Sequence, residues 1–166
     1  MLNEYNVPSA NGGDGIPVNI KLRSEQHEVL PAPGTKAAAQ PHDSTVMDTI
    51  IPGRLTVENG EITLSYIDKE NEDSEDDVKM TFYENRPGYC IIARNGFASS
   101  VFAIEQGKMQ QAVYSLMFGE MFFNVKGITV TSHINENGGT AYLYYSVYVN
   151  GSVVQRMKLN IEVTPA

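Results

Sequence analysis

Apolar and polar residues alternate with a period of two along most of this chain, which is the pattern of β-strands that bury one face. In the last segment the odd-numbered residues from Val153 to Val163 are apolar apart from Gln155, whereas the even-numbered residues include Arg156 and Glu162. The odd-numbered face of this segment is therefore predicted to be buried.

The alternation predicts about ten short strands separated by turn residues, and no long helix. Residues 68–77 are predicted to form an acidic loop, and residues 30–45, which contain three prolines, a long excursion between strands. Segment 110–118 has a composition that suits a short helix, but its apolar residues alternate as in a strand. The predicted strands cover residues 18–29, 46–57, 62–67, 78–83, 89–94, 100–105, 110–118, 121–125, 128–134, 141–149 and 153–163.

The last two strands meet at Asn150-Gly151, and the length of this turn decides where three tyrosines lie. A two-residue type I′ turn would place Tyr142, Tyr144 and Tyr148 on the buried face. A three-residue loop that adds Val149, with Gly151 left-handed in a bulge, would turn them outward. We favour the bulged loop, because it keeps the aliphatic residues of both strands together. Its pairs would be Leu143 with Met157, Tyr144 with Arg156 and Tyr142 with Lys158.

A chain of 166 residues suits one domain with a proper core. Residues 1–15 are polar and glycine-rich, so we expect a disordered arm there, followed by one barrel domain over residues 16–166. An open sheet of about ten strands would leave exposed edges, so a single antiparallel up-and-down barrel is the economical all-β architecture. A two-sheet sandwich is the alternative.

Composition restricts the partners and the cellular compartment that we expect for the protein. The formal net charge of −8 disfavours nucleic acid and anionic membranes as partners. Cys90 is the single cysteine and lies in an apolar run, so we expect a buried thiol and no disulfide within the chain. The N-terminus has no signal-peptide pattern, and no apolar run reaches transmembrane length. These features predict a cytoplasmic protein.

Short motifs along the predicted strands resemble those of the YwiB-like family. Tyr66 is followed two residues later by Asp68, Arg94 and Gly96 form an Arg-x-Gly motif, and Tyr114 precedes Phe118-Gly119, where the family has Tyr-x-Thr-Pro-Tyr-Gly. Leu116-Met117 replaces the Thr-Pro pair of that motif. The resemblance covers roughly residues 18–163. The family comprises bacterial proteins, mostly of Firmicutes, so the resemblance implies a calycin-like (lipocalin-like) β-barrel with no established function.

Many calycin barrels hold apolar ligands, which suggests a small-ligand site inside this one. The ligand signatures of lipocalins and fatty-acid-binding proteins are missing, since the chain has no tryptophan and its last strand carries Arg156-Met157-Lys158. An interior filled by the chain's own side chains is the alternative. If a ligand cavity exists, we expect its lining to include Tyr66, Ile92, Arg94, Tyr114 and Phe118.

Arg94 gives the sharpest indication of a ligand. It shares a strand face with Cys90 and Ile92, so an inward orientation would place a guanidinium in an apolar interior, where it needs an anion. That anion would be Asp68, Glu105 or a ligand carboxylate. The alternative is an Arg94 at the barrel rim that bonds turn carbonyls beside Gly96.

A second hypothesis is an interaction module or homodimer that uses an outward aromatic and basic sheet face, since tyrosine and arginine are typical of binding hot spots. An ordinary sheet surface is the alternative for this face, which comprises Tyr142, Tyr144, Tyr148, Arg156 and Lys158.

Catalysis is not expected. No catalytic residues are proposed, because no serine lies in a nucleophile-elbow context and no carboxylate pair is placed for acid and base roles. The acidic residues 68–77 lack the glycine and terminal glutamate of a calcium-binding EF-hand loop, so no metal or other cofactor is predicted. A small hydrolase or isomerase is the third hypothesis.

Overall fold

A computed structural model of the chain describes residues 15–29, 44–71 and 74–166, so most of the predicted arm and residues 30–43 lie outside the described part. The described residues form ten strands, and no helix among them is long and apolar enough to cross a membrane. The strands are β1 (Ile16–Glu28), β2 (Ser44–Glu58), β3 (Glu61–Asn71), β4 (Ser74–Tyr83), β5 (Tyr89–Asn95), β6 (Ser99–Glu105), β7 (Met109–Leu116), β8 (Gly119–Asn135), β9 (Gly138–Val149) and β10 (Ser152–Pro165).

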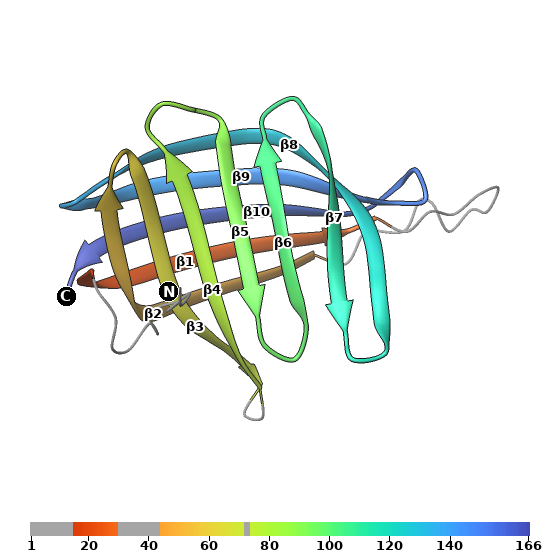
Figure 1. Cartoon of the computed structure of the whole chain (residues 1–166), viewed down its shortest axis with the longest axis horizontal. Coiled ribbons are helices and arrows are strands. Elements are labelled where there is room, and N and C mark those ends of the chain that lie inside the picture. The colour runs from red at the N-terminus through yellow and green to blue at the C-terminus, as the bar shows by residue number, and fades with distance from the viewer. Residues whose placement is uncertain (1–14, 30–43, 72–73) are drawn as a thin grey trace, which may run out of the picture.

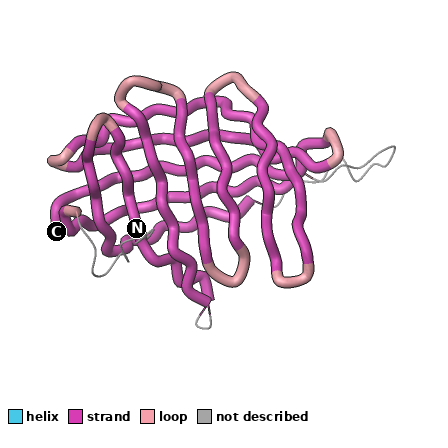
Figure 2. The backbone as a smooth tube through the Cα atoms, in the orientation of Figure 1, coloured by secondary structure: helices cyan, strands magenta, loops and turns pink. Residues whose placement is uncertain are grey.

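The ten strands close into one antiparallel barrel. Each strand pairs with its sequence neighbours, and β1 pairs with both β2 and β10, so the sheet has the up-and-down order that the sequence predicts. Figure 1 shows β3 to β7 crossing in front of the longer strands β8, β9, β10, β1 and β2. The tube in Figure 2 shows strand and turn throughout the described chain. The predicted all-β barrel is confirmed.

The interior of the barrel holds the apolar side chains of the alternating pattern. The largest fully buried side chains come from strands on every side of the barrel, and they include Ile20, Leu55, Leu64, Ile104 and Leu143. Since successive residues of a strand point to opposite faces, this alternation commits each strand to one register. The core therefore runs through the whole barrel.

The closing hairpin differs from the favoured three-residue loop. Ser152 pairs with Val149, and Asn150 and Gly151 both have positive φ, as a two-residue type I′ turn requires. A bulge between Val153 and Gln155 then shifts the register by one residue, so that Leu143 faces Leu159 inside the barrel. The bulge lies in the strand instead of the turn, and it still keeps the aliphatic residues of both strands together.

Two further expectations need correction. The predicted strands 121–125 and 128–134 are one continuous strand, β8, with a register shift between Gly127 and Thr129 in its pairing with β9. The predicted acidic loop is largely a hairpin, since β3 runs to Asn71 and β4 starts at Ser74. Acidic side chains disfavour a strand only weakly when pairing and burial of the neighbouring residues favour it.

Two neighbouring strand pairs, β2 with β3 and β6 with β7, are paired over only part of their length. The ladder from β2 to β3 begins only at Gly53, directly after Pro52, which has no backbone N–H to donate. The ladder from β6 to β7 has only three pairs, Ser99 to Val101 with Val113 to Ser115. Beyond it, β8 approaches β6 directly at Gly127, where an added Cβ would overlap the Glu105 carbonyl.

Replacing Gly127 with alanine should lower the free energy of unfolding by about 1–3 kcal/mol, because the methyl group must displace the Glu105 backbone. Urea denaturation followed by circular dichroism measures this change. Lys126→Ala, at the exposed neighbouring position, is the matched control and should stay within about 0.5 kcal/mol of the parent. Equal midpoints for the two variants would contradict the close approach of β8 to β6.

Candidate functional site

The strand register brings three of the five proposed ligand residues into one inner layer. Tyr66 pairs with Val78, Val78 with Arg94, Arg94 with Ser100, and Ser100 with Tyr114. Directly opposed residues of antiparallel strands share a face. Tyr66 and Ser100 are buried here, whereas Arg94 and Tyr114 are half-buried.

The other two proposed ligand residues lie elsewhere. Ile92 is buried one step deeper along β5, in the apolar core. Phe118 is 84% exposed in the turn between β7 and β8, so its predicted place in the barrel interior is wrong. The alternation along β7 predicts an inward Phe118, but the strand ends at Leu116. Met117 and Phe118 therefore lie in the turn and do not continue the alternation.

Arg94 is held by two carboxylates of the chain itself. Its Nη1 donates to Asp76 Oδ2 at 3.0 Å and its Nη2 donates to Asp68 Oδ2 at 3.2 Å. The three side chains are 26%, 19% and 22% exposed in the order Arg94, Asp76, Asp68. Burial by itself would lower the pKa of Arg94, but the hydrogen bond that Arg94 donates to Asp76 and the charge of Asp68 outweigh it and raise that pKa. The guanidinium therefore stays charged.

The position of Asp76 depends on its neighbours. Asp68 and Asp76 are cross-strand partners on β3 and β4, so one arginine on β5 can reach both. Gly96 leaves room for the Asp76 carboxylate, which a Cβ at that position would overlap. This explains the Arg-x-Gly spacing in physical terms. We call Arg94, Asp68 and Asp76 the charged triad.

The anion partners of Arg94 are only partly those expected. The sequence predicts Asp68 as a possible partner of Arg94. It does not predict Asp76, because it indicates an acidic loop over residues 68–77, whereas Asp76 lies on strand β4. Glu105 instead forms ion pairs with Arg86 at 3.0 Å and Lys108 at 3.5 Å. Since two carboxylates already face the guanidinium, an anionic ligand would have to displace one of them.

Sequence reasoning also missed Tyr145, a buried tyrosine on the inner face of β9. Its burial raises the pKa of the phenol, and the nearby charge of Arg94 opposes that rise. Its ring lies 6.0 Å from the ring of Phe102, centroid to centroid. Burial likewise raises the pKa of the Cys90 thiol, which suits an inert core residue and not a nucleophile.

Two pockets of the described residues lie on the outside of the barrel. The larger, about 630 Å³, is an outer groove over β1, β8, β9 and β10 that includes Lys21, Tyr142 and Glu162. The smaller, about 380 Å³, lies beside the β4–β5 turn and includes Pro87 and Gln106. The apolar core lies inside the barrel.

The tyrosine face lies on the outer surface of β9, but it is not freely exposed. Tyr142, Tyr144 and Tyr148 are each half-buried, and the Lys158 ammonium lies 5.0 Å from the centre of the Tyr144 ring. The shifted register corrects the predicted cross-strand pairs. Tyr144 lies opposite Lys158, Tyr142 opposite Asn160, and Arg156 opposite Ser146.

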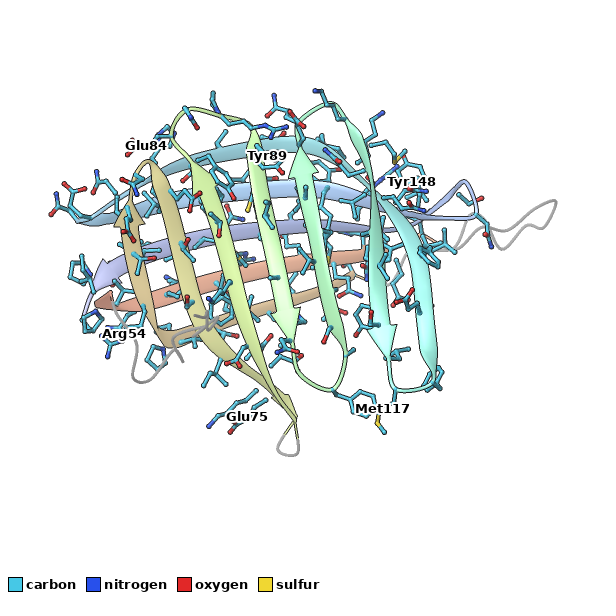
Figure 3. The ribbon with its side chains drawn as sticks, in the orientation of Figure 1. Arg54, Glu75, Glu84, Tyr89, Met117 and Tyr148 are labelled. Carbon is cyan, nitrogen blue, oxygen red and sulfur yellow. The ribbon has the colours of Figure 1, made fainter. Side chains whose placement is uncertain are left out.

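A larger exposed apolar surface lies on β6, β7, β8 and the turns beside them. Val101 pairs with Val113, and Val113 with Phe122, so these three outer positions form one row across three strands. The neighbouring turns add Phe97, Met117 and Phe118. Met121 pairs with Tyr114 and so lies on the other face of β8 from Phe122, but it is exposed at the same end of the strand. Figure 3 labels Met117 at the lower edge of the barrel. We call this set the apolar rim: Phe97, Val101, Met117, Phe118, Met121 and Phe122.

Sequence reasoning missed the apolar rim as a surface, although a signal was present. The two residues of the turn before Gly119 are Met117 and Phe118, whereas turns are usually formed by glycine, proline, asparagine, aspartate and serine. Two large apolar residues are therefore unusual in such a turn. Within the described ranges, no group of three or more His, Cys, Asp or Glu side chains is arranged to hold a metal ion.

Replacing Arg94 with methionine should lower the free energy of unfolding by roughly 1–3 kcal/mol, since it leaves Asp68 and Asp76 facing each other without a cation. Arg23→Met is the matched control. Arg23 pairs with Asp48 at 3.1 Å on the outer surface, with both side chains about half exposed, so its loss should cost below about 1 kcal/mol. Chemical denaturation of both variants tests the difference, and equal losses would argue against a structural role for the triad.

Comparison with known proteins agrees with this architecture. The crystal structure of the YwiB protein from Bacillus subtilis is similar to the fold, with a TM-score of 0.64 and 18% sequence identity, and the match covers 89% of this chain and 91% of that chain. No curated protein matches the chain. The family model described as "Domain of unknown function (DUF1934)" matches residues 35–161. The resemblance to the YwiB-like family is thereby confirmed, and the chain belongs to the DUF1934 family of β-barrel proteins.

Proposed function

We propose that this barrel is a noncatalytic interaction module that binds a protein partner through the apolar rim. The observation that carries the proposal is the exposure of Met117 and Phe118, at 87% and 84%, in the turn that leads into β8 with its exposed Phe122. Large exposed apolar patches are typical of interaction sites on soluble proteins. Methionine and phenylalanine are also enriched in interface cores.

The energetics of the apolar rim support a binding role. Full burial of a side chain such as Phe or Met is worth about 1.5–3 kcal/mol relative to leaving it in water. Met117 and Phe118 gain little of this within the chain, because both are largely exposed. A partner that covers the rim would gain it instead, minus the cost of association.

The other features of the chain are consistent with a noncatalytic role in the cytoplasm. The Cys90 thiol is buried, and the carboxylates of the charged triad face an arginine instead of an open reaction site. The net charge of −8 opposes binding of the apolar rim to an anionic membrane. The tyrosine face is a weaker interface candidate, because its side chains are half-buried and Tyr144 already contacts Lys158.

The double variant Met117→Ser/Phe118→Ser tests the proposal. We expect that affinity purification from the natural host recovers a partner with the parent chain and loses it with the double variant. The recovered partner, once purified, should bind the parent at least about tenfold more tightly than the variant in a fluorescence titration, since burial of two large apolar side chains is lost. Both residues lie in an exposed turn, so circular dichroism should show an unchanged fold.

Ile50→Ser is the matched control. Ile50 is 69% exposed on β2, outside the apolar rim, and its substitution removes the exposed apolar surface of one large side chain. It should leave partner binding within about twofold of the parent. Equal loss with Ile50→Ser, or no loss with the double variant, would contradict the assignment of the site.

A second candidate function is binding of a small ligand at the inner layer that contains Tyr66, Arg94 and Tyr114. The half-buried state of Arg94 and Tyr114 favours it, because solvent reaches this layer of the barrel. Since two carboxylates face one guanidinium and exceed its charge, a neutral ligand with an apolar body and a hydrogen-bonding group fits better than an anion.

Native mass spectrometry of the protein purified from its host tests this second candidate. A bound small molecule should appear with the parent and be lost with Tyr114→Ala, while Tyr148→Ala on the outer face of β9 should retain it. A bare parent chain under gentle desolvation would count against ligand binding.

A further inference from the structure

We propose that the partner bound by the apolar rim is a basic amphipathic polypeptide, whose cationic residues reach the acidic β3–β4 hairpin while its apolar residues cover the rim. This inference rests on the proposed function and adds to it the chemistry of the partner. We propose a basic partner because acidic residues outnumber basic residues at the end of the barrel that carries the apolar rim.

The acidic hairpin and the apolar rim lie at the same end of the barrel. The end of β3, the start of β4 and the β5–β6 and β7–β8 connections all lie along the lower edge in Figure 1. Glu75 and Met117, at the two sides of this edge, are labelled in Figure 3. Phe97 lies in the connection between them, so a polypeptide that lies along the edge meets acidic and apolar side chains in turn.

The acidic excess is encoded in the sequence of the hairpin. Between Asp68 and Asp77 the chain carries seven acidic residues and a single cation, Lys69. Two of the acids, Asp68 and Asp76, are matched by Arg94, and Glu75 lies 3.5 Å from Lys69. In the part of the chain that the structure describes, Asp77 forms no ion pair, nor does Glu120, which lies in β8 between Phe118 and Met121.

These charges discriminate between possible occupants. A second copy of the chain would bring another net charge of −8 to the same end, and an anionic membrane would also be repelled. A polypeptide with lysine or arginine beside large apolar residues would be attracted and could bury the rim. Rim charges of this kind raise the association rate and select the partner, while apolar contacts supply most of the affinity.

Three synthetic peptides of equal length test the inference with the full chain. One alternates leucine and lysine in amphipathic spacing, the second replaces lysine with glutamate, and the third replaces leucine with serine. Fluorescence anisotropy at low salt should give binding of the leucine–lysine peptide at least about tenfold tighter than of either other peptide. Raising the salt to about 0.5 M should remove most of the preference for the leucine–lysine peptide over the leucine–glutamate peptide, because exposed charges are screened.

Two charge variants of equal net charge locate the effect. Neutralising Glu75, Asp77 and Glu120 as Glu75→Gln/Asp77→Asn/Glu120→Gln should weaken the leucine–lysine peptide by about fivefold to tenfold. The matched control is Glu58→Gln/Glu84→Gln/Glu136→Gln, which changes three exposed acids away from this edge, one at the end of β2 and two in turns. The control should change binding by less than about twofold.

The outcomes separate this inference from the proposed function. If the leucine–lysine and leucine–glutamate peptides bind equally and Met117→Ser/Phe118→Ser abolishes both, the apolar rim binds partners and the charge inference is wrong. If the serine–lysine peptide binds as well as the leucine–lysine peptide, attraction is purely electrostatic and the inference is also wrong. If no peptide binds and the double variant also retains its host partner, both proposals fail.

Two further results would overturn the choice of occupant. A dimer in gel filtration with light scattering that Met117→Ser/Phe118→Ser converts to a monomer would identify a second copy on the apolar rim. Binding to phosphatidylserine vesicles that the same double variant abolishes would identify a membrane surface. The expected result is a monomeric parent chain that does not bind these vesicles.

Discussion

Closure of the sheet between β1 and β10 is the constraint on which the rest of this structure depends. Val18 near the start of the described chain pairs with Pro165 near its end, so the barrel closes only if every intervening register is consistent. A slip of one residue anywhere would turn a buried row outward. The bulge between Val153 and Gln155 and the register shift near Ile128 provide the adjustment that a strict two-residue period lacks.

The charged triad is placed where this apolar core ends. Arg94 continues the inner face of Cys90 and Ile92, and a third aliphatic residue there would extend the core toward the open edge. A guanidinium instead needs carboxylates, which Asp76 supplies from the neighbouring strand β4 and Asp68 from β3, one strand further on. The triad thereby links β3, β4 and β5, and among the described acids of the hairpin it leaves Asp77 without an ion pair.

Much of the fold follows from the sequence, because a two-residue period and turn residues are local signals. The strands around Asn59-Gly60 and Asn150-Gly151 are predicted nearly as they occur. The bulge in β10 was not predicted, since nothing local distinguishes a bulge in the turn from a bulge three residues later. The inner position of Arg94 follows from its strand face. The contact of Asp76 with Arg94 does not, because it depends on how β4 pairs with β5. The effect of the Arg94 charge on Tyr145 does not either, because β5 and β9 are distant in sequence.

The misassignment of Phe118 explains what the apolar rim contributes. A period of two would have placed Phe118 inside the barrel with Ala112 and Tyr114, where its burial would help to hold the fold. The strand ends at Leu116, and the barrel closes without Met117 or Phe118 in its core. The two largest apolar residues of this turn therefore contribute little to folding, and in the isolated chain they leave apolar surface in water. The partner contact that we propose therefore rests on residues that the core does not use, and the acidic hairpin at the same edge is the basis for proposing a basic partner.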